Sequence, residues 1–463
     1  MIIPTIRRYL KKVFDTITSE KYKHNLLQAI PFWVASLITG LVAVFYNRLF
    51  AICESFAEWV MDWHRWLIFI LMPACFLIAW WLVVRFAKYA GGSGIPQVMA
   101  SIELANPKHN KKVEKLLSLR IFFIKILSSL VMIAGGGVIG REGPTIQLAG
   151  AVFRTVNNWL PDWWPKISKR NMIMTGAAAG LAAAFNTPLG GIVFAVEELT
   201  KTHISYFKTA LFSAVIIAGL TAQGLLGPYL YLGYPDVTNL SASIFLGLIL
   251  VGIITGISGG IMSRLILMMI DWRATIKTQS KQILFVAGCA LVIASVAYFL
   301  DQRVLGSGKE VMITTLFSTE KNVHWYTALF RIAGPILSFG TGAAGGVFAP
   351  SLGAGAGLGS LMAGWFETSV TNTNLIILCG MVGFLTGVTR SPFTSAILVL
   401  EMTDRHNVIF HLMIAGMIAS LVSRLIDKRS LYDHLKLRCV RDLQHEGTAP
   451  QIQDALHPSV AKE

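Results

Sequence analysis

The sequence predicts an all-α polytopic membrane protein whose tilted and broken helices form two inverted repeats. Of its 463 residues, 54% are hydrophobic and only 14% are charged, whereas a soluble globular protein carries about a quarter charged residues. Apolar stretches long enough to cross a hydrocarbon core of about 30 Å recur along the whole chain. Several are interrupted by glycine and proline, and two parts of the chain resemble each other.

The apolar stretches mark the expected membrane helices. In chain order they are residues 30–52, 66–87, 121–140, 172–196, 211–225, 244–270, 283–300, 375–400 and 409–426. Because glycine and proline interrupt some of them, we expect more helices than stretches. The expected organisation is a cytoplasmic N-terminal segment at 1–29, a first half at 30–230, a second half at 231–430 and a short cytoplasmic tail at 431–463. Residues 1–24 are basic and polar, so no cleavable signal peptide is expected.

Part of the net charge of +15 lies in two basic clusters at the ends of the apolar region. The basic residues that flank it are Arg7, Arg8, Lys11, Lys12, Lys21, Lys23, Arg424, Lys428, Arg429, Lys436, Arg438 and Arg441. The positive-inside rule places both clusters, and hence both termini, in the cytoplasm. No basic stripe alternates with aromatic residues, so nucleic acid is not an expected partner. The five cysteines are scattered without metal-binding spacing, and we expect no metal site and no cofactor.

An internal repeat relates the two halves. Three pairs of segments match in the same order, namely 92–94 with 306–308 (both Gly-Ser-Gly), 140–144 with 346–350, and 176–197 with 380–401. Lysine is abundant after the first Gly-Ser-Gly, whereas charges of both signs surround the second, so the halves are expected to lie antiparallel in the membrane. Inverted repeats with broken helices are a transporter architecture whose substrate site lies near the membrane midplane.

Three loops combine glycine and proline within apolar surroundings, and each is expected to begin a helix. They are residues 91–96, 140–144 and 345–350. Glycine permits close backbone approach, and proline is well tolerated in a first helical turn. A helix start presents unpaired N–H groups and about half a positive charge, which suits an anion. Such partial charges, with a hydroxyl such as that of Ser93, bind an ion weakly enough for it to leave again.

Two acidic residues lie in apolar segments, where acids are costly and mark ion or proton paths. Glu142 adjoins a predicted helix start, so its carboxylate can occupy the anion site and be released by protonation. Glu198 lies near the end of an apolar helix and can pass protons to the cytoplasm. The structural alternatives are an ion pair of Glu142 with Arg141 and an ion-paired helix-end acid at Glu198. Lys125 and Arg331, each alone in an apolar run, are expected to stabilise the fold or raise the local potential.

The three glycine loops resemble the signature motifs of the CLC family of chloride channels and chloride/proton antiporters. GSGIP at 92–96, GREGP at 140–144 and GVFAP at 346–350 occur in the family's order, and the resemblance extends to Tyr432. It implies the CLC fold and a homodimer in the lipid bilayer, with one pore per subunit. The resemblance is to the prokaryotic antiporter branch, which implies the plasma (inner) membrane of a prokaryote and a transporter rather than an enzyme.

The resemblance also assigns roles to residues. Glu142 matches the external gate and proton carrier, and Glu198 matches the internal proton-transfer glutamate of antiporters, where channels typically carry a non-acidic residue. The expected function is therefore chloride/proton antiport, with a passive voltage- or pH-gated chloride channel as the alternative. Nitrate-preferring relatives tend to have proline in place of Ser93, and the loops of the fluoride-exporting branch differ. The chloride-binding residues implied are Ser93, Gly94, Ile95, Val347, Phe348 and Tyr432.

The sequence departs from the family pattern in two places. Gln97 stands where many members have glutamate, and too few residues follow Tyr432 for the paired regulatory domains of most eukaryotic members.

Residues 256–260 fit the G-x-S-x-G motif of hydrolases, but they lie in an apolar stretch rather than at a strand-to-helix elbow. A cation-coupled symporter would leave three convergent helix starts unexplained and lacks acidic cation ligands.

Overall fold

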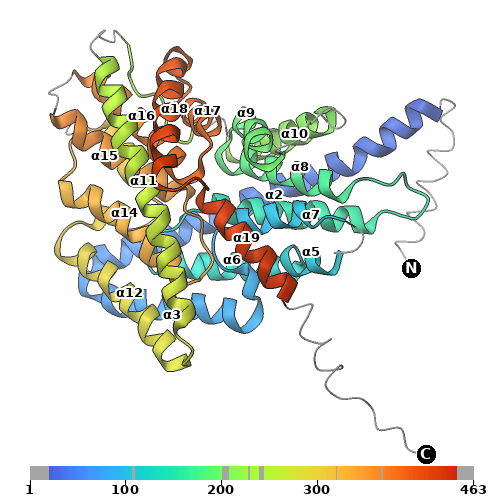
Figure 1. Ribbon diagram of the computed structural model, residues 1–463, viewed down its shortest axis with the longest axis horizontal. Helices are drawn as coiled ribbons and strands as arrows, with labels where there is room; N and C mark the ends of the chain where they lie inside the picture. Colours follow the sequence, from blue (N-terminus) through green and yellow to red (C-terminus); the bar gives the residue numbers. More distant parts are fainter. Residues whose placement is uncertain are drawn as a thin grey trace, which may run out of the picture.

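The computed structural model describes residues 20–106, 110–200, 208–227, 230–238, 244–319, 321–365 and 369–445, and no β-strand forms within them (Figure 1). The first half contains α2 (Glu20–Trp63), α3 (Ile68–Phe86), α4 (Ile95–Glu103), α5 (Asn110–Leu116), α6 (Leu119–Ala134), α7 (Glu142–Trp159), α8 (Lys169–Phe185), α9 (Pro188–Phe194), the π-helix η4 (Ala195–Thr200) and α10 (Lys208–Leu226). The second half contains α11 (Ile244–Thr275), α12 (Gln279–Phe299), α13 (Lys309–Phe317), α14 (Trp325–Gly340), α15 (Phe348–Trp365), α16 (Val370–Thr389), α17 (Pro392–Thr403), α18 (Ile409–Ile426) and α19 (Leu431–His445). Short 3-10 turns precede α3, α4, α13 and α18.

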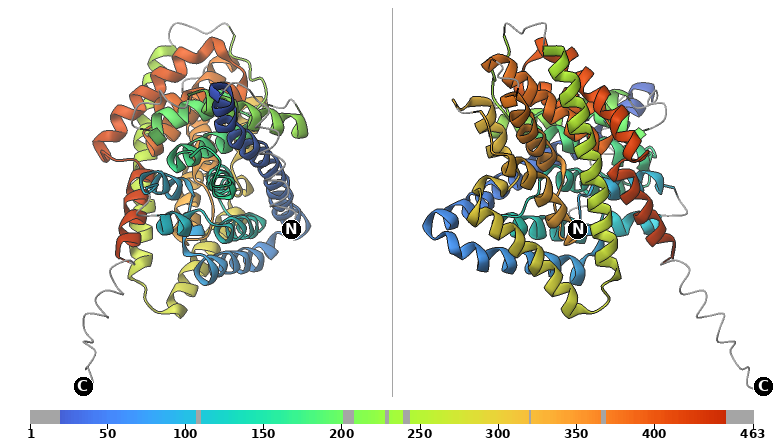
Figure 2. Two further views of the ribbon diagram at one scale, coloured as in Figure 1. Left: turned by 90° about the vertical axis from the view of Figure 1, so that its right-hand side faces the viewer. Right: turned by 60° about the vertical axis from the view of Figure 1, so that its left-hand side comes forward.

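Eight helices among the described residues are long and apolar enough to cross a membrane, as the composition predicts. The long helices α2 and α11 run along the outside of the molecule and expose apolar side chains (Figure 2). By contrast, α8 and α15 are buried along nearly their whole length. The predicted breaks are confirmed, because the apolar stretch 172–196 divides into α8, α9 and η4, and the stretch 375–400 divides into α16 and α17.

The two halves share backbone geometry at matching positions. Asn186 ends α8 and Arg390 ends α16, both in the left-handed region at φ 58° and 65°. The next residues, Thr187 and Ser391, have φ of −127° and −116° and are the N-caps of α9 and α17. A proline follows in both halves, where its fixed φ suits a first helical position. The repeat predicted from sequence is therefore present in the fold.

Each half supplies a carboxylate that caps a helix of the other half. The amides of Leu189 and Gly190 at the start of α9 donate to Glu401 of α17, at 3.0 and 2.6 Å. Glu197 of η4 accepts in the same way from the first turn of α17, at 3.2 and 2.7 Å. A carboxylate at a helix N-terminus satisfies otherwise unpaired N–H groups and opposes the positive end of the helix dipole. These reciprocal caps join the two halves.

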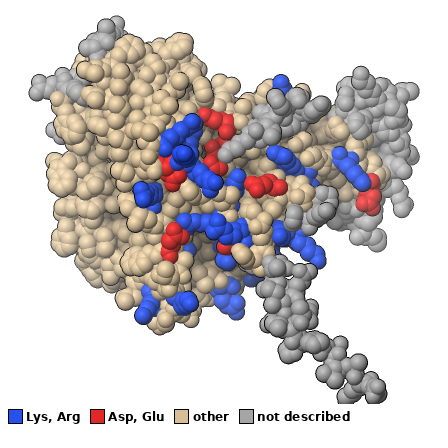
Figure 3. All heavy atoms as spheres, viewed as in Figure 1, with Lys and Arg blue, Asp and Glu red and all other residues tan. Residues whose placement is uncertain are grey.

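The last helix packs back onto the core. α19 contacts α4, α11 and α16, and its second residue, Tyr432, is fully buried. Three ion pairs hold its polar face, namely Lys436–Glu103, Arg438–Asp271 and Lys88–Asp442. Charged side chains gather around the hollowed middle of the face that α19 crosses, whereas the left part of that face is nearly free of charge (Figure 3). The expected C-terminal tail thus begins as an ordered helix that reaches the interior.

We expect Glu401→Ala to lower the free energy of unfolding by about 1–3 kcal/mol, because two helix N–H groups lose their acceptor. Thermal unfolding of the detergent-solubilised protein measures this change. Glu103→Ala is the matched control, since its partly exposed pair with Lys436 contributes at most about 1 kcal/mol. Equal losses in the two variants would contradict the capping role.

Candidate functional site

Three glycine-containing loops meet in the buried interior and are joined by backbone hydrogen bonds. The Gly92 amide donates to the Ala343 carbonyl at 2.9 Å, and the Gly345 amide donates to the Gly92 carbonyl at 3.1 Å. Gly140 and Gly346 exchange two hydrogen bonds, at 2.7 and 2.8 Å. The loops lead into α4, α7 and α15. Three helix starts that lie far apart in the sequence are therefore fixed beside one another.

Glycine is required where these loops touch. Gly94 has a φ of +104°, and a Cβ atom there would lie 2.7 Å from the Gly143 carbonyl oxygen. A Cβ on Gly143 would lie 2.3 Å from the Ser93 Oγ. Both distances are shorter than van der Waals contact, so any larger residue would force the starts of α4 and α7 apart.

Two buried basic side chains hold the carbonyl groups of the Gly-Ser-Gly loops. The Lys125 Nζ donates to the carbonyls of Ala90 and Gly92, at 2.8 and 2.6 Å. Arg331 takes the matching place in the second half, where its Nη1 donates to the carbonyls of residues 304–306 at 3.0, 2.8 and 3.3 Å. Neither side chain is exposed. Their contacts are with the loop backbone, which agrees with the structural role predicted for both.

Two buried hydroxyls in this region have no protein partner. The Ser93 Oγ and the Tyr432 hydroxyl make no hydrogen bond within the standard distance to any described residue, and each side chain is almost wholly buried. The two hydroxyls lie near each other. Because an unpaired buried polar group is costly, two of them beside one another indicate a place for a ligand that accepts hydrogen bonds.

The predicted chloride-binding backbone lies in the same region. Gly94 is the N-cap of α4 and follows Ser93 directly, and α15 begins at Phe348, just after the loop joined to Gly140. The first N–H groups of a helix have no acceptor within it, so these two helix starts present donors to the space between them. All six residues of the predicted set are buried, namely Ser93, Gly94, Ile95, Val347, Phe348 and Tyr432.

Glu142 places a carboxylate at one of these helix starts. It is the first residue of α7 and is 1% exposed. Its carboxylate lies against the amide of Ala349, the second residue of α15, as well as its own amide. A carboxyl group of the chain therefore lies at a helix start, where unpaired N–H groups favour an anion. Arg141 next to it donates to Asn47 and lies over the Tyr231 ring at 5.6 Å.

Glu198 lines a cavity of about 710 Å³. It is 6% exposed and belongs to the π-helix η4, an element that often marks functional sites. Its Oε2 accepts a hydrogen bond from the Ser391 Oγ at 2.6 Å. The basic residues Arg390, Arg424 and Lys428 line the same cavity. The Tyr432 hydroxyl lies within electrostatic range of the carboxyl groups of Glu198 and Glu142.

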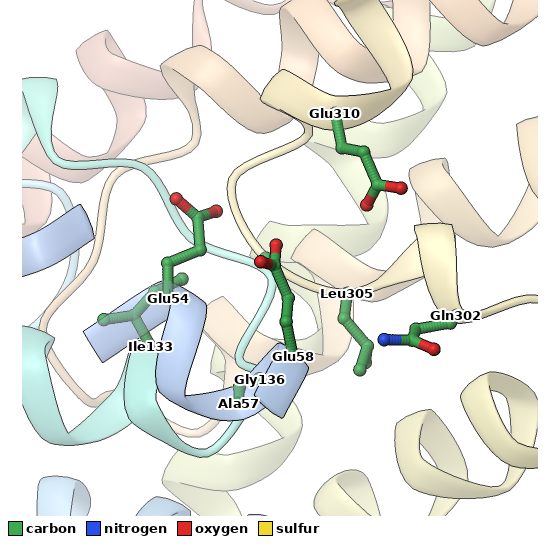
Figure 4. A pocket seen from close by; sticks show the side chains of 9 residues that line it. Glu54, Ala57, Glu58, Ile133, Gly136, Gln302, Leu305 and Glu310 are labelled. Atoms are coloured by element: carbon green, nitrogen blue, oxygen red, sulfur yellow. The ribbon is translucent and has the colours of Figure 1, made fainter. Parts of the chain in front are cut away.

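The second Gly-Ser-Gly loop faces a different, acidic pocket. The carboxylates of Glu54 and Glu58 from α2 and of Glu310 from α13 point into one space (Figure 4). The Glu54 Oε1 accepts a hydrogen bond from the Ser307 amide at 2.7 Å. Ser307 matches Ser93 in the repeat. The Ser93 hydroxyl has no hydrogen-bond partner among the described residues, whereas the Ser307 amide donates to the Glu54 carboxylate.

Gln97 has contacts that an ionised carboxylate could not make. Its Nε2 donates to the Gly91 carbonyl at 2.7 Å and lies 3.4 Å from the Tyr89 carbonyl oxygen. An ionised glutamate has no N–H to donate, so it would have to turn away from these carbonyls. Gln97, which stands where many family members have glutamate, therefore makes hydrogen bonds that an ionised glutamate could not make.

Sequence reasoning missed three polar contacts around the site. Asn47 with Arg141, Ser391 with Glu198, and Glu54 with Ser307 join residues that are 94, 193 and 253 positions apart. The repeat alignment was the one available signal, since it marks the segments that contain Ser307 and Ser391. It could not identify the partners of these two serines, because Glu54 and Glu198 come from the other half of the chain.

Comparisons with known proteins support the same family. The model of the family described as voltage gated chloride channel matches residues 75–424. A protein named H(+)/Cl(-) exchange transporter ClcA from Cronobacter sakazakii is 30% identical over 84% of this chain and 83% of its own length. A protein of the same name from Vibrio cholerae is 28% identical over 90% of this chain and 91% of its own length.

Solved structures share the fold. The crystal structure of a slow cyanobacterial Cl−/H+ antiporter superposes with a TM-score of 0.78 at 23% identity, covering 90% of this chain and 98% of that one. A CLC-type fluoride/proton antiporter superposes with a TM-score of 0.74 at 21% identity, over 90% of this chain and 98% of its own. At these identities the likeness concerns the architecture alone.

We expect a halide to bind beside Ser93, Phe348 and Tyr432. Bromide-soaked crystals should show anomalous density there, and Tyr432→Phe should weaken chloride binding in calorimetry. The loss of one hydrogen bond to an ion costs about 1.5–3 kcal/mol, or roughly tenfold to a hundredfold in affinity. Thr403→Val is the control, since the Thr403 hydroxyl bonds only carbonyls of α17. Absence of halide density at these three residues would refute the site.

Proposed function

The chain belongs to the voltage-gated chloride channel family, and on that basis we propose that it exchanges chloride for protons across a membrane. One observation carries the proposal: the Glu142 carboxylate lies at the start of α15, in the region that also holds the unpaired hydroxyls of Ser93 and Tyr432. A chloride ion and this carboxylate are both anions that suit the same donors. They therefore compete for one pathway.

Competition at this place links the two ions. Ionised Glu142 blocks the pathway because it takes the donors at the start of α15. Protonation removes its charge and its attraction to those donors, so the side chain can leave and chloride can enter. When chloride departs, Glu142 loses its proton and returns. One side chain thereby gates the anion and carries the proton.

Glu198 favours exchange over passive conduction. The protons that Glu142 carries need a route to the other side of the membrane, and Glu198 provides a carboxylate within the electrostatic reach of Tyr432. It also borders the basic cavity, which can gather anions. A passive chloride channel has no use for a second buried acid here, and a buried acid is costly to keep.

We also propose the setting in which exchange takes place. The protein is an integral membrane protein with eight candidate spans in its described residues. Its curated relatives are bacterial, and the basic flanks of the chain favour cytoplasmic termini. The inner membrane of a prokaryote, a homodimeric assembly and one pathway per subunit complete the proposal. The ions are chloride and protons, with no cofactor.

The decisive experiment records chloride and proton movement together in reconstituted vesicles. A chloride gradient should drive protons uphill through the wild-type protein, because an exchanger couples the two flows. Glu198→Gln should abolish proton movement while chloride still crosses, since the amide carries no exchangeable carboxyl proton. Chloride flux without any proton movement in the wild type would identify a passive channel.

We expect Glu142→Ala to abolish proton coupling and to leave chloride flux independent of external pH. The substitution removes both the group that blocks the pathway and the group that carries the proton. The same vesicle assay, run over a range of external pH, measures both effects. Glu310→Gln is the control, because that acid lines the acidic pocket with Glu54 and Glu58 rather than the α15 start. Proton coupling that persists in Glu142→Ala would rule out its assigned role.

A further inference from the structure

Ser391 has an unusual place among helix N-cap residues. It precedes Pro392 at the start of α17, where a serine side chain ordinarily accepts a hydrogen bond from the first helical turn. Its hydroxyl makes no such bond. Instead it donates to the Glu198 Oε2 at 2.6 Å, and the side chain is 2% exposed.

The capping role that Ser391 leaves open is taken by another residue. Glu197, the neighbour of Glu198, accepts from the amides of Phe393 and Thr394 at 3.2 and 2.7 Å, and from the Thr394 hydroxyl at 2.7 Å. The adjacent acids thus divide two tasks. Glu197 completes the helix, and the serine hydroxyl is left to bind Glu198.

The repeat provides an internal comparison. Thr187 matches Ser391 in the aligned segments and caps α9 with nearly the same backbone angles. Glu401 caps α9 as Glu197 caps α17. The residue after Glu401 is Met402, so the second half has no counterpart of Glu198. Accordingly, the Thr187 hydroxyl is buried and has no hydrogen-bond partner among the described residues. The capping pair is duplicated, whereas the serine–glutamate pair occurs on one side.

The charged groups around Glu198 come from several elements. Glu197 lies next to it in η4. The cavity that it borders is also lined by Arg390 after α16, by Arg424 and Lys428 at and beyond the end of α18, and by Asp433 of α19. Tyr432 of α19 lies within electrostatic range. Of the helices packed against η4, α9 has no titratable residue, and those of α8, Lys169 and Arg170, are in its first turn.

We propose that Ser391 is the positioning residue of the inner proton step, holding the Glu198 carboxylate toward the cavity and setting the pH at which it takes up a proton. The inference rests on the proposed exchange function. A hydroxyl that donates to a carboxylate stabilises its ionised form. Without this donor, Glu198 retains its proton up to a higher pH. Ser391→Ala therefore shifts the inner-side pH dependence of proton transport by about one unit toward alkaline pH.

The test measures chloride-driven proton transport in reconstituted vesicles as the pH on the Glu198 side is varied. Ser391→Thr keeps the hydroxyl, and the threonine at the matching position 187 indicates that this backbone accommodates the side chain. It should keep the wild-type profile. Thr187→Val removes the equivalent hydroxyl, which has no acid beside it, and should leave the profile unchanged. Chloride flux recorded in the same vesicles verifies that each variant is folded.

The possible outcomes distinguish a failure of this inference from a failure of the proposed exchange function. A wild-type protein that moves chloride without protons overturns the exchange function and this inference together. A coupled wild type with an unshifted Ser391→Ala profile overturns the inference alone. So does a Ser391→Thr or Thr187→Val profile that shifts as far as that of Ser391→Ala. A shift confined to Ser391→Ala supports it.

Discussion

The convergence of three glycine loops is the constraint on which the site depends. Backbone hydrogen bonds join Gly92 to the 343–345 segment and Gly140 to Gly346. Lys125 and Arg331 then hold the carbonyl groups of the two Gly-Ser-Gly loops. Irregular backbone at membrane depth is tolerated only when its polar groups are satisfied or line a cavity. With the carbonyls engaged by basic side chains, amides and hydroxyls remain as the groups that can meet an anion.

The same arrangement keeps the basic side chains of Lys125 and Arg331 on the loop backbone. A lysine or arginine in direct contact would bind an anion too tightly for rapid release. The buried side chains of Lys125 and Arg331 act instead through the loop backbone that they hold. Both side chains are therefore engaged by loop carbonyls. The glutamate at the α15 start can therefore compete with the ion on similar terms.

The two halves share the residues that shape their helix ends and differ at the residues of the proposed ion path. Both halves have a left-handed residue, an N-cap, a proline and a capping glutamate at matching positions. The differences lie at the ion path. Ser93 is open in the first half, whereas Ser307 is covered by Glu54 in the second. Glu198 has no acidic counterpart. The capping residues are thus common to both halves, whereas the open Ser93 and the acid Glu198 occur in the first half.

The sequence by itself determined the class and the repeat, and it marked the residues of the proposed site. Apolar stretches, glycine–proline loops and two isolated acids are local patterns, so spacing along the chain reveals them. The tertiary structure alone decided which groups meet. Glu401 caps a helix of the first half, Glu197 one of the second, and Ser391 reaches Glu198 across 193 positions. Such pairs form only when the two halves fold against each other, so the pattern of residues along the chain does not reveal them.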